Sequence, residues 1–518
     1  MSTVLLPPLI PPTTPSTGAP RLEKLEDIQG DVWSKGFPKS YETYYLFQIK
    51  RPAEFAGCLN KMITNKPHLI PNLNMVKDKR DEINYERQLA KEHQDKPKRL
   101  PIANALIAFT YKGLEAIQSG RQSHDDLWLD DIKATDPAFC RGMRSDGPAL
   151  NDPTTKLNPL FSDPNVIHGL LKVAGSSKET VEERLKEIQL DLQRGTVITD
   201  VPGGFEGRLD GATRGGKNRG KEHFGFQDGI SQPLMNGLDD IPPPDPGAAL
   251  ATSTMETDPK FLITTKDTRS QDTNGVTRPD WMYQGSFLVF RKLVQNVKAY
   301  NDLVQNNFKK YGCQTADHMG AKLMGRWPSG APIALPAYHT SDAPPTDRCK
   351  VKKMNSFLYE KVDDSSAPHG CPLAAHIRKT NPRRADEKDS NSGDPGLLFT
   401  KIIRGGIPYG PDYTPGEPAG TERGLLFACY QGNIEDGFRH MQMIWCNNDS
   451  FPKGGSGFDP IVGQAKRPED LKTLITADGT EQVPINPPLV TFRGGEYFFV
   501  PSIPALKGAL TVNSAPLH

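Results

Sequence analysis

The stretch Phe224-Gly-Phe-Gln-Asp-Gly-Ile-Ser-Gln-Pro233 places one acidic residue, Asp228, among closely spaced glycines. It follows a segment rich in glycine and arginine that runs from Gly203 to Lys221. An Asp-Gly pair commonly marks a turn, whereas glycines around an acidic residue let a flat, bulky ligand approach the backbone closely. The segment lacks the Gly-Lys-Ser/Thr ending of a phosphate-binding loop. A turn and a ligand site therefore both remain open at this point.

A second segment, Cys371-Pro-Leu-Ala-Ala-His-Ile-Arg-Lys-Thr-Asn-Pro-Arg383, contains His376 directly after two alanines. The small alanines leave room for a large ring, and the cations that follow suit carboxylate groups. A histidine in such a place can also be a packing residue. A zinc site with His369 and Cys371 is a further alternative, but three ligands fall short of the four that structural zinc requires.

A third segment, Ile402-Ile-Arg-Gly-Gly-Ile-Pro-Tyr-Gly410, carries Arg404 in a glycine-rich loop. Taken alone, such an arginine is usually solvated or paired with a carboxylate. It becomes of interest only in combination with the other two segments.

The apolar patterns around these segments predict both strands and helices. Strands are expected at 44–50, 105–110, 166–175, 286–293, 424–430 and 496–502. One helix is expected after residue 175, with a capping box of Ser176 and Glu179, an apolar face of Val181, Leu185, Ile188 and Leu192, and an end at Gly195. Other helices are expected at 300–312 and after 430 through Met443. Because strands and helices do not alternate regularly, the pattern favours an α+β fold.

The 518 residues are too many for one core of ordinary size, so two domains or one pseudo-symmetric unit are expected. The proline-rich residues 1–24 are interpreted as a disordered arm, 25–237 and 281–518 as two domains, and 238–280 as a linker or long insertion. A second loose stretch is expected at 383–395. The net charge of +1 argues against a nucleic-acid partner, and the sequence contains no long apolar run that predicts a membrane span.

The seven cysteines are scattered and form no Cys-x-x-Cys pair, which argues against a disulfide scaffold. The first twenty residues contain six prolines and no Lys or Arg, unlike a conventional signal peptide. An intracellular or unconventionally secreted protein is therefore expected. The sequence holds one glycosylation sequon, Asn448-Asp449-Ser450.

Together, the three segments resemble the dye-decolourising peroxidases, most closely the fungal branch. Supporting matches are Ile28-Gln-Gly-Asp31, the GRWPSGAP stretch from Gly325 and the FDPIVGQ stretch from Phe458. The resemblance spans roughly residues 25–510. Two departures are Gly405, where the family often has a second arginine after Arg404, and the sequence Tyr283-Gln-Gly285.

The resemblance implies two ferredoxin-like units with antiparallel sheets, a dimeric α+β barrel-like architecture within one chain. It also implies a peroxidase that binds one haem b, reduces hydrogen peroxide, and oxidises dyes, phenols and other aromatic donors. The N-terminal domain would carry the distal Asp228, and the C-terminal domain the haem ligand and the distal arginine.

By the same resemblance, His376 is the iron ligand, Asp228 the proton shuttle and Arg404 the distal stabiliser. Arg378, Gly229 and Asp459 are expected to support the cofactor, with Asp459 holding the histidine ring. Tyr409 and Trp445 are candidates for electron transfer at the surface, and ordinary packing is their alternative. A non-enzymatic protein that binds or delivers haem is the competing class, and it would need His376 but not the pair of Asp228 and Arg404. Haem oxygenase-like or chlorite-degrading relatives lack this pair.

Overall fold

The computed structural model describes residues 24–98, 100–121, 129–203, 205–239, 256–265, 277–342, 354–355, 357, 359, 370–383, 400–475 and 482–511. The prediction of a disordered arm lies outside these residues except for Lys24. Residues 384–395 of the second loose stretch also lie outside them.

The described chain mixes helices with strands. The helices are α1 (Pro52–Asn65), α2 (Leu73–Glu92), α3 (Tyr111–Ser119), α4 (Leu129–Thr135), α5 (Pro137–Leu150), α6 (Lys178–Asp191), α8 (Val297–Asn307), α9 (Ala316–Met324), α11 (His376–Thr380), the π-helix η10 (Glu435–Cys446) and α13 (Ile503–Lys507). The strands are β1 (Tyr41–Ile49), β2 (Ala103–Phe109), β3 (Gly169–Gly175), β4 (Ile198–Asp200), β5 (Arg208–Ala212), β6 (Leu234–Met235), β7 (Glu256–Thr257), β8 (Ser286–Gln295), β9 (Ile403–Arg404), β10 (Ile407–Tyr409), β11 (Gly424–Gln431), β12 (Lys472–Leu474), β13 (Gln482–Pro484) and β14 (Val490–Val500).

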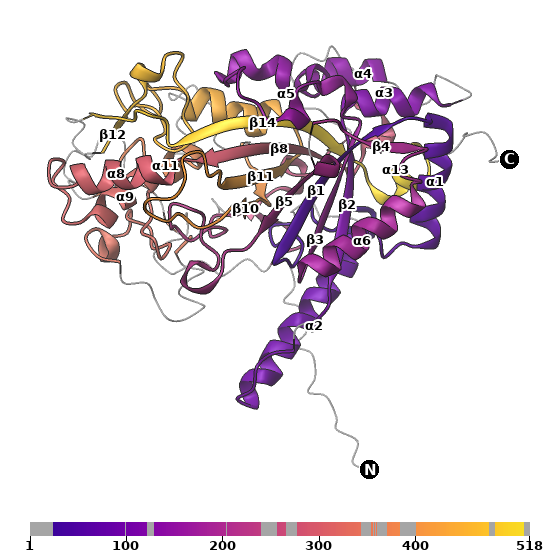
Figure 1. Ribbon diagram of the computed structural model, residues 1–518, viewed down its shortest axis with the longest axis horizontal. Coiled ribbons are helices and arrows are strands. Elements are labelled where there is room, and N and C mark those ends of the chain that lie inside the picture. The colour runs from indigo at the N-terminus through magenta and orange to yellow at the C-terminus, as the bar shows by residue number, and fades with distance from the viewer. Residues whose placement is uncertain are drawn as a thin grey trace.

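One large antiparallel sheet organises the molecule (Figure 1), with the strand order β10-β11-β8-β14-β2-β3-β1-β4. Strand β5 also pairs with β1, and β9 with β11. The two halves of the sheet are joined by one residue pair, Phe499 of β14 with Phe109 of β2. At the other end, β5 lies against β10, since a Cβ on Gly211 would come within 2.4 Å of Ile407 Cγ2. The sheet therefore curves round until its ends meet, which confirms the barrel-like α+β expectation.

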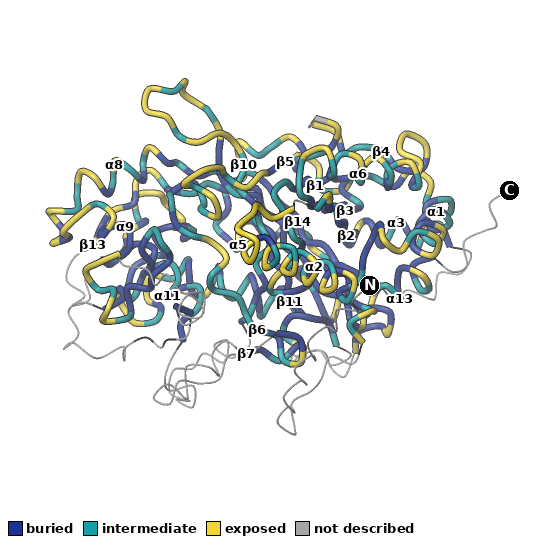
Figure 2. The backbone as a smooth tube through the Cα atoms, turned by 90° about the horizontal axis from the view of Figure 1, so that it is seen from below, coloured by how far each residue is buried: buried dark blue, intermediate teal, exposed yellow. Residues whose placement is uncertain are grey.

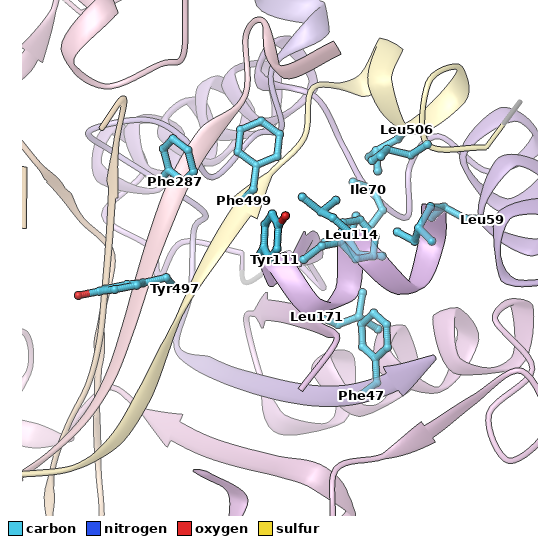
Figure 3. Close-up of a cluster of buried hydrophobic side chains, with 14 of the residues drawn as sticks. Phe47, Leu59, Ile70, Tyr111, Leu114, Leu171, Phe287, Tyr497, Phe499 and Leu506 are labelled. Atoms are coloured by element: carbon cyan, nitrogen blue, oxygen red, sulfur yellow. The ribbon is translucent and has the colours of Figure 1, made fainter. Parts of the chain in front are cut away.

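Two hydrophobic cores follow from this curvature, because successive strand side chains point to opposite faces. The inner core takes one alternate set from the strands, with Tyr44, Leu106, Leu170, Leu288, Phe498 and Tyr430 among its members. The outer core takes the other set and packs it against α1, α3, α5, α6 and α13. Figure 2 shows the strands as the buried interior, and Figure 3 shows Phe47 and Leu171 of the sheet beside Leu59 and Leu114 of the helices.

The helices differ in how far they belong to this body. Figure 1 shows α1, α3 and α6 around the N-terminal strands, whereas α8, α9 and α11 gather beyond the C-terminal strands. The long helix α2 projects from the body, and Tyr85 on it is exposed. Within the described part of the chain, no helix has both the length and the apolar composition needed to cross a bilayer.

The expected strands at 44–50, 105–110, 286–293, 424–430 and 496–502 all lie largely within observed strands. The strand expected from Val166 begins only at Gly169, because Pro164–Val166 form a short 3-10 turn. The helix expected at 300–312 spans Val297–Asn307, so its predicted end at Gly312 was wrong.

The predicted capping box of α6 was also wrong. The N-cap is Ser177, whose side chain accepts from Thr180 N, while the Thr180 side chain accepts from Ser177 N. Ser176 is unavailable because its hydroxyl accepts from Ile102 N and its own N–H donates to the Ile102 carbonyl. The buried face of the helix is the one predicted, with Val181, Leu185 and Ile188.

The described parts of the connection between the predicted domains pack into the molecule. Leu238, Leu262 and Ile263 join the inner core, and the short strand β7 pairs in parallel with β6. The domain bounds themselves stay a prediction.

Candidate active site

A cavity of about 670 Å³ opens where the Gly-rich loop, the segment 400–408 and α11 converge. Its volume lies in the range of about 300–1,000 Å³ typical of sites for cofactors and other small ligands. Apolar lining comes from Met324, Phe427, Phe438, Met441, Ile461 and Val462. Asp228, Gly229, Arg404 and His376 line the same cavity. The tertiary structure thus brings the three sequence segments together in one place.

The loop that carries Asp228 is held in shape by Glu222. This partly buried carboxylate accepts hydrogen bonds from the backbone N–H groups of Phe224 and Phe226, both at 2.8 Å. The loop turns back at Gly225, where φ is +102°, and again at Gly229, where φ is +78°. Both values lie in the left-handed region that favours glycine. At Gly229, open space lies in the direction of a Cβ, so a ligand can approach the backbone there.

Arg404 is fixed against this loop by several contacts. Its Nη1 donates to Asp228 Oδ1 at 2.7 Å, and its Nη2 donates to the Ser231 carbonyl at 2.6 Å. The Gln232 side chain bonds both backbone groups of Arg404, with Nε2 donating to its carbonyl at 2.7 Å and Oε1 accepting from its N–H at 3.0 Å. The guanidinium therefore presents a defined edge to the cavity.

The pKa of Asp228 lies below its ordinary value of 3.8. Burial alone would raise this pKa, but the positive charge and hydrogen bond of Arg404 and the backbone N–H of Gly229 outweigh it. The Asp228 side chain keeps 39% of its surface exposed. The carboxylate is therefore ionised and accessible from the cavity at neutral pH.

His376 begins α11, and its Nδ1 lies 2.8 Å from Asp459 Oδ2. The other oxygen of Asp459 accepts from the backbone N–H groups of Ile461 and Val462 at 2.8 and 2.9 Å. Asp459 is fully buried, and although burial would raise its pKa, the contact with His376 lowers it. A carboxylate that fixes Nδ1 in this way leaves Nε2 as the free ligand atom, the usual arrangement of a metal-binding histidine.

Comparison of the chain with known proteins identifies its family. The family model "DyP dimeric alpha+beta barrel domain" matches residues 27–204, and "Dyp-type peroxidase, C-terminal" matches residues 263–453. The chain is 34% identical to dye-decolorizing peroxidase msp1 of Mycetinis scorodonius, over 94% of this chain and 88% of that one. It is 32% identical to a dye-decolorizing peroxidase of Auricularia auricula-judae, over 94% and 87%.

The chain belongs to the dye-decolourising peroxidase family. Solved structures agree: an ancestral D-type dye-decolorizing peroxidase has a TM-score of 0.76 and 35% identity, over 95% of this chain and all of that one. A dye-decolorizing peroxidase in complex with 2,6-dimethoxyphenol has a TM-score of 0.73 and 29% identity, over 94% and 99%. The protein is thus a haem peroxidase of this family, and the alternative of a non-enzymatic haem carrier is not supported.

Within this peroxidase, Arg378 does not reach the cavity. Its Nη1 donates to the Cys371 carbonyl, and its guanidinium lies 4.9 Å from the ring centre of Tyr359. Because the first turn of α11 directs His376 into the cavity, the side chain two residues later points into the protein. The structure therefore does not support the predicted contact of Arg378 with the cofactor.

Arg326 lies at the cavity instead, in the GRWPSGAP stretch, from which no role was predicted for it. It is buried with Arg383, and neither guanidinium forms an ion pair with a carboxylate of the described residues. Arg326 donates to carbonyls and to Ser231 Oγ, and the Nε of Arg383 is buried without a hydrogen bond. Burial and the neighbouring Arg383 lower the pKa of Arg326 to about 9. An anion at this wall would offset both effects.

The two predicted electron-transfer residues lie in different settings. Tyr409 is half-buried on β10, with its hydroxyl 3.2 Å from Glu422 Oε1 and the Lys292 ammonium 5.0 Å from its ring centre. Trp445 is only 1% exposed and stacks on Phe451. Trp445 is thus not a surface aromatic, which contradicts that part of the prediction.

Six of the seven cysteines lie in the described part of the chain. Cys58, Cys140, Cys313, Cys371, Cys429 and Cys446 are all free thiols, and most are buried. Among the described residues, no cluster of His, Cys, Asp and Glu could hold a metal ion. His369, part of the zinc alternative, lies outside these residues.

Proposed function

We propose that His376 would hold the iron of one haem b per chain and that Asp228 and Arg404 activate hydrogen peroxide in the same cavity. The observation that carries this proposal is the convergence in one cavity of His376, whose ring is held from behind by the buried Asp459, with the pair of Asp228 and Arg404. A haem carrier would need His376 and Asp459 only.

The donor set and the walls of the cavity fit a haem. A neutral imidazole with one nitrogen held by a carboxylate is a suitable iron ligand. The apolar side chains suit the porphyrin ring, and the buried guanidinium of Arg326, which lies at the cavity, suits its propionates. Bound haem supplies the redox chemistry and stores the oxidising equivalents of the peroxide.

The residues of the chain move the proton and stabilise the charge. Asp228, ionised and accessible, accepts a proton from one oxygen of hydrogen peroxide and delivers it to the other. Arg404 stays charged throughout and stabilises the negative charge that develops on the departing oxygen. Since the Asp228 pKa is already low, the carboxylate is in its accepting form before peroxide arrives.

We further propose dyes and phenols as electron donors. Several curated relatives are named dye-decolorizing peroxidases, and one related structure is a complex with 2,6-dimethoxyphenol. The cavity also carries more basic than acidic side chains, among them Lys35, Arg80 and Lys221, which suits donors with anionic groups.

The substitution His376→Ala tests the proposal. We expect the variant to bind haem weakly, with a shifted Soret band, and to lose almost all peroxidase turnover. The measurement is haem titration of the purified apoprotein followed by absorption, together with turnover of a phenol. His68→Ala, at an exposed position, is the matched control and should behave as wild type. A His376→Ala protein with an unchanged ferric spectrum would exclude His376 as the ligand.

A further inference from the structure

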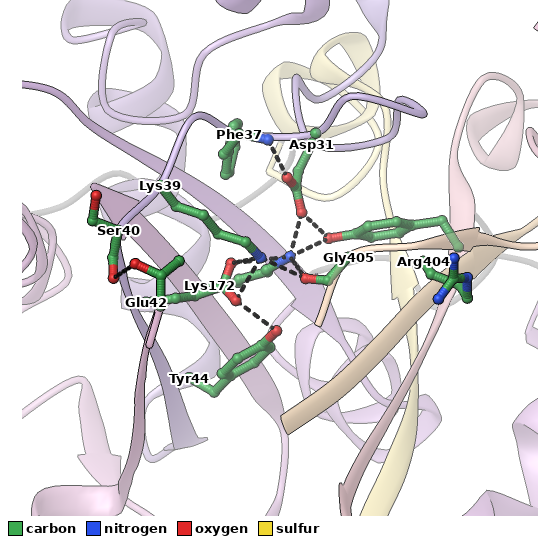
Figure 4. Close-up of polar contacts among 12 residues, drawn as sticks. Asp31, Phe37, Lys39, Ser40, Glu42, Tyr44, Lys172, Arg404 and Gly405 are labelled. Carbon is green, nitrogen blue, oxygen red and sulfur yellow. Dashed lines mark hydrogen bonds and ion pairs between the residues drawn. The ribbon is translucent and has the colours of Figure 1, made fainter. Parts of the chain in front are cut away.

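A cluster of charged side chains lies inside the barrel next to the proposed active site (Figure 4). Lys172 Nζ contacts Asp31 Oδ2 at 2.5 Å and Glu42 Oε1 at 3.2 Å, and Lys39 Nζ contacts Glu42 Oε2 at 2.8 Å. The side chains of Lys172 and Glu42 are fully buried, and that of Asp31 is 2% exposed. Tyr430 donates to Asp31 as well. The cluster pairs two cations with two anions.

Both lysines also donate to the same backbone atom. Lys39 Nζ lies 2.7 Å from the carbonyl oxygen of Gly405, and Lys172 Nζ lies 3.0 Å from it. Such hydrogen bonds are stronger than neutral ones because the donor is charged. A Cβ at residue 405 would lie 3.2 Å from Lys172 Nζ and 3.4 Å from Tyr430 Cε2, so a larger residue would crowd both side chains.

This carbonyl belongs to the residue that follows Arg404. Strand β9 is only two residues long, and Gly405 and Gly406 connect it to β10. Two successive glycines allow many backbone conformations, so contacts from other segments are needed to restrain the backbone at this point. Figure 4 shows Arg404 beside the cluster, with the Gly405 carbonyl between the lysines and the arginine. The two lysines supply this restraint through the Gly405 carbonyl.

The energetics of buried charges argue against stability as the whole reason for the cluster. Replacement of a buried ion pair by apolar residues of similar volume is often neutral or stabilising. Burial would raise the pKa of Asp31, but the charges of Lys172 and Lys39 lower it, so the carboxylate remains ionised. Asp31 belongs to the Ile28–Asp31 motif, to which the proposed function gives no role. Its Oδ1 accepts from Phe37 N at 2.7 Å, which ties the loop before Lys39 to the cluster.

We propose that the cluster of Asp31, Lys39, Glu42 and Lys172 positions Arg404 through the Gly405 carbonyl and thereby sets the orientation of the guanidinium toward Asp228 and peroxide. These are positioning residues, and the inference rests on the proposed role of Arg404. The N-terminal half of the chain thus contributes to the geometry of an arginine supplied by the C-terminal half.

The substitution Lys39→Met tests the inference at the most exposed member of the cluster, whose side chain is 18% exposed. Stopped-flow mixing of the haem-loaded protein with hydrogen peroxide measures the rate constant, normalised to bound haem. We expect a decrease on the order of 10-fold, within the range of up to about 10²-fold that a misplacement of 1 Å can cost. Lys39→Arg keeps a cationic donor and should restore most of the rate. Lys66→Met, a surface lysine paired with Asp191, should react as wild type.

A double-variant cycle separates positioning from general damage. Arg404→Leu should lose on the order of 10²–10³-fold in the peroxide step, and Lys39→Met should add nothing in that background. Gly405→Ala disturbs the same lysine–carbonyl contact from the side of the carbonyl, and it should behave like Lys39→Met. If the losses from Lys39→Met and Arg404→Leu were additive, or if Lys39→Met and Gly405→Ala both reacted at the normal rate, this inference would be overturned. The proposed role of Arg404 would then still stand. A normal rate in Arg404→Leu would remove the proposed role of Arg404, and the inference with it.

Discussion

Asp228 is a carboxylate on which two opposing effects act at the scale of a single side chain. Burial disfavours its charge, and Arg404, 2.7 Å away, favours it more strongly. The lowered pKa means that the ionised form persists to a lower pH than for an ordinary aspartate. A histidine base, in contrast, is lost below about pH 6. The proposed base is therefore adapted to acidic solution.

This pKa predicts the pH dependence of the peroxide step. In the wild type, we expect the rate to hold as pH falls to the ordinary aspartate value of 3.8 and to decline only below it. Asp228→Asn should be slower by about 10²–10⁴-fold, the usual contribution of a general base, with no dependence on pH in this range. Stopped-flow rates from pH 3 to 7 check this, with the exposed Asp130→Asn as control. An Asp228→Asn protein that matches wild type throughout would show that another group accepts the proton.

At the scale of elements, helix α5 and strand β14 meet at a buried carboxyl group. The helix is kinked at Gly142, where φ is +73°, and the kink frees the N–H of Met143. Glu496 on β14 accepts this N–H at 2.7 Å and that of Tyr497 at 2.8 Å. Burial raises the pKa of Glu496 to about 7. The free N–H of Met143 at the kink therefore finds its hydrogen-bond acceptor in Glu496, a carboxyl group whose burial disfavours ionisation.

The raised pKa predicts a dependence of stability on pH. The stabilising contribution of protonated Glu496 is fully present below its unfolded pKa of 4.5 and is lost as pH rises through about 7. Its full size is on the order of 3 kcal/mol. Glu496→Gln keeps an acceptor oxygen but cannot ionise. We expect the melting temperature of this variant to exceed that of wild type at pH 8 and to approach it at pH 4. Parallel curves for the two proteins would show that Glu496 does not titrate in this range.

At the scale of the whole molecule, we propose that small donors react in the cavity, whereas a bulky dye exchanges electrons at the surface. Tyr409 follows the segment of Arg404 and lies between the cavity wall at Pro408 and the partly exposed Glu422. Its hydroxyl can pass a proton to this carboxylate when the ring loses an electron. Trp445 has no such access to solvent.

Tyr409→Phe should therefore slow the oxidation of a bulky dye several-fold and leave that of a small phenol unchanged. Trp445→Phe should lower the melting temperature, because it removes packed volume from the core, and should affect both donors equally. Steady-state rates with the two donors distinguish the variants, and the exposed Tyr85→Phe is the control. Equal rates for both donors in Tyr409→Phe would assign this tyrosine to packing.

Much of this protein could be predicted from local sequence. Strands such as β1 and β11 and the apolar face of α6 follow from the period of their side chains, which depends only on neighbouring residues. The family resemblance pointed to Asp228, His376, Arg404 and Asp459 because each lies in a short, distinctive segment. The α6 cap was missed because Ser176 bonds to Ile102, a residue far away in the chain.

Long-range contacts decided what the sequence could not. The approach of β5 to β10 closes the barrel, and this closure places Lys172 of the N-terminal half within 3.0 Å of the Gly405 carbonyl. Arg326 lies at the cavity and Arg378 does not, because their side chains point in different directions. Helix geometry and burial determine these directions only in the folded chain. Local periodicity specifies elements because its forces act between near neighbours. The proposed active site is assembled from residues 228, 326, 376 and 404, and only the packed chain brings these to one cavity.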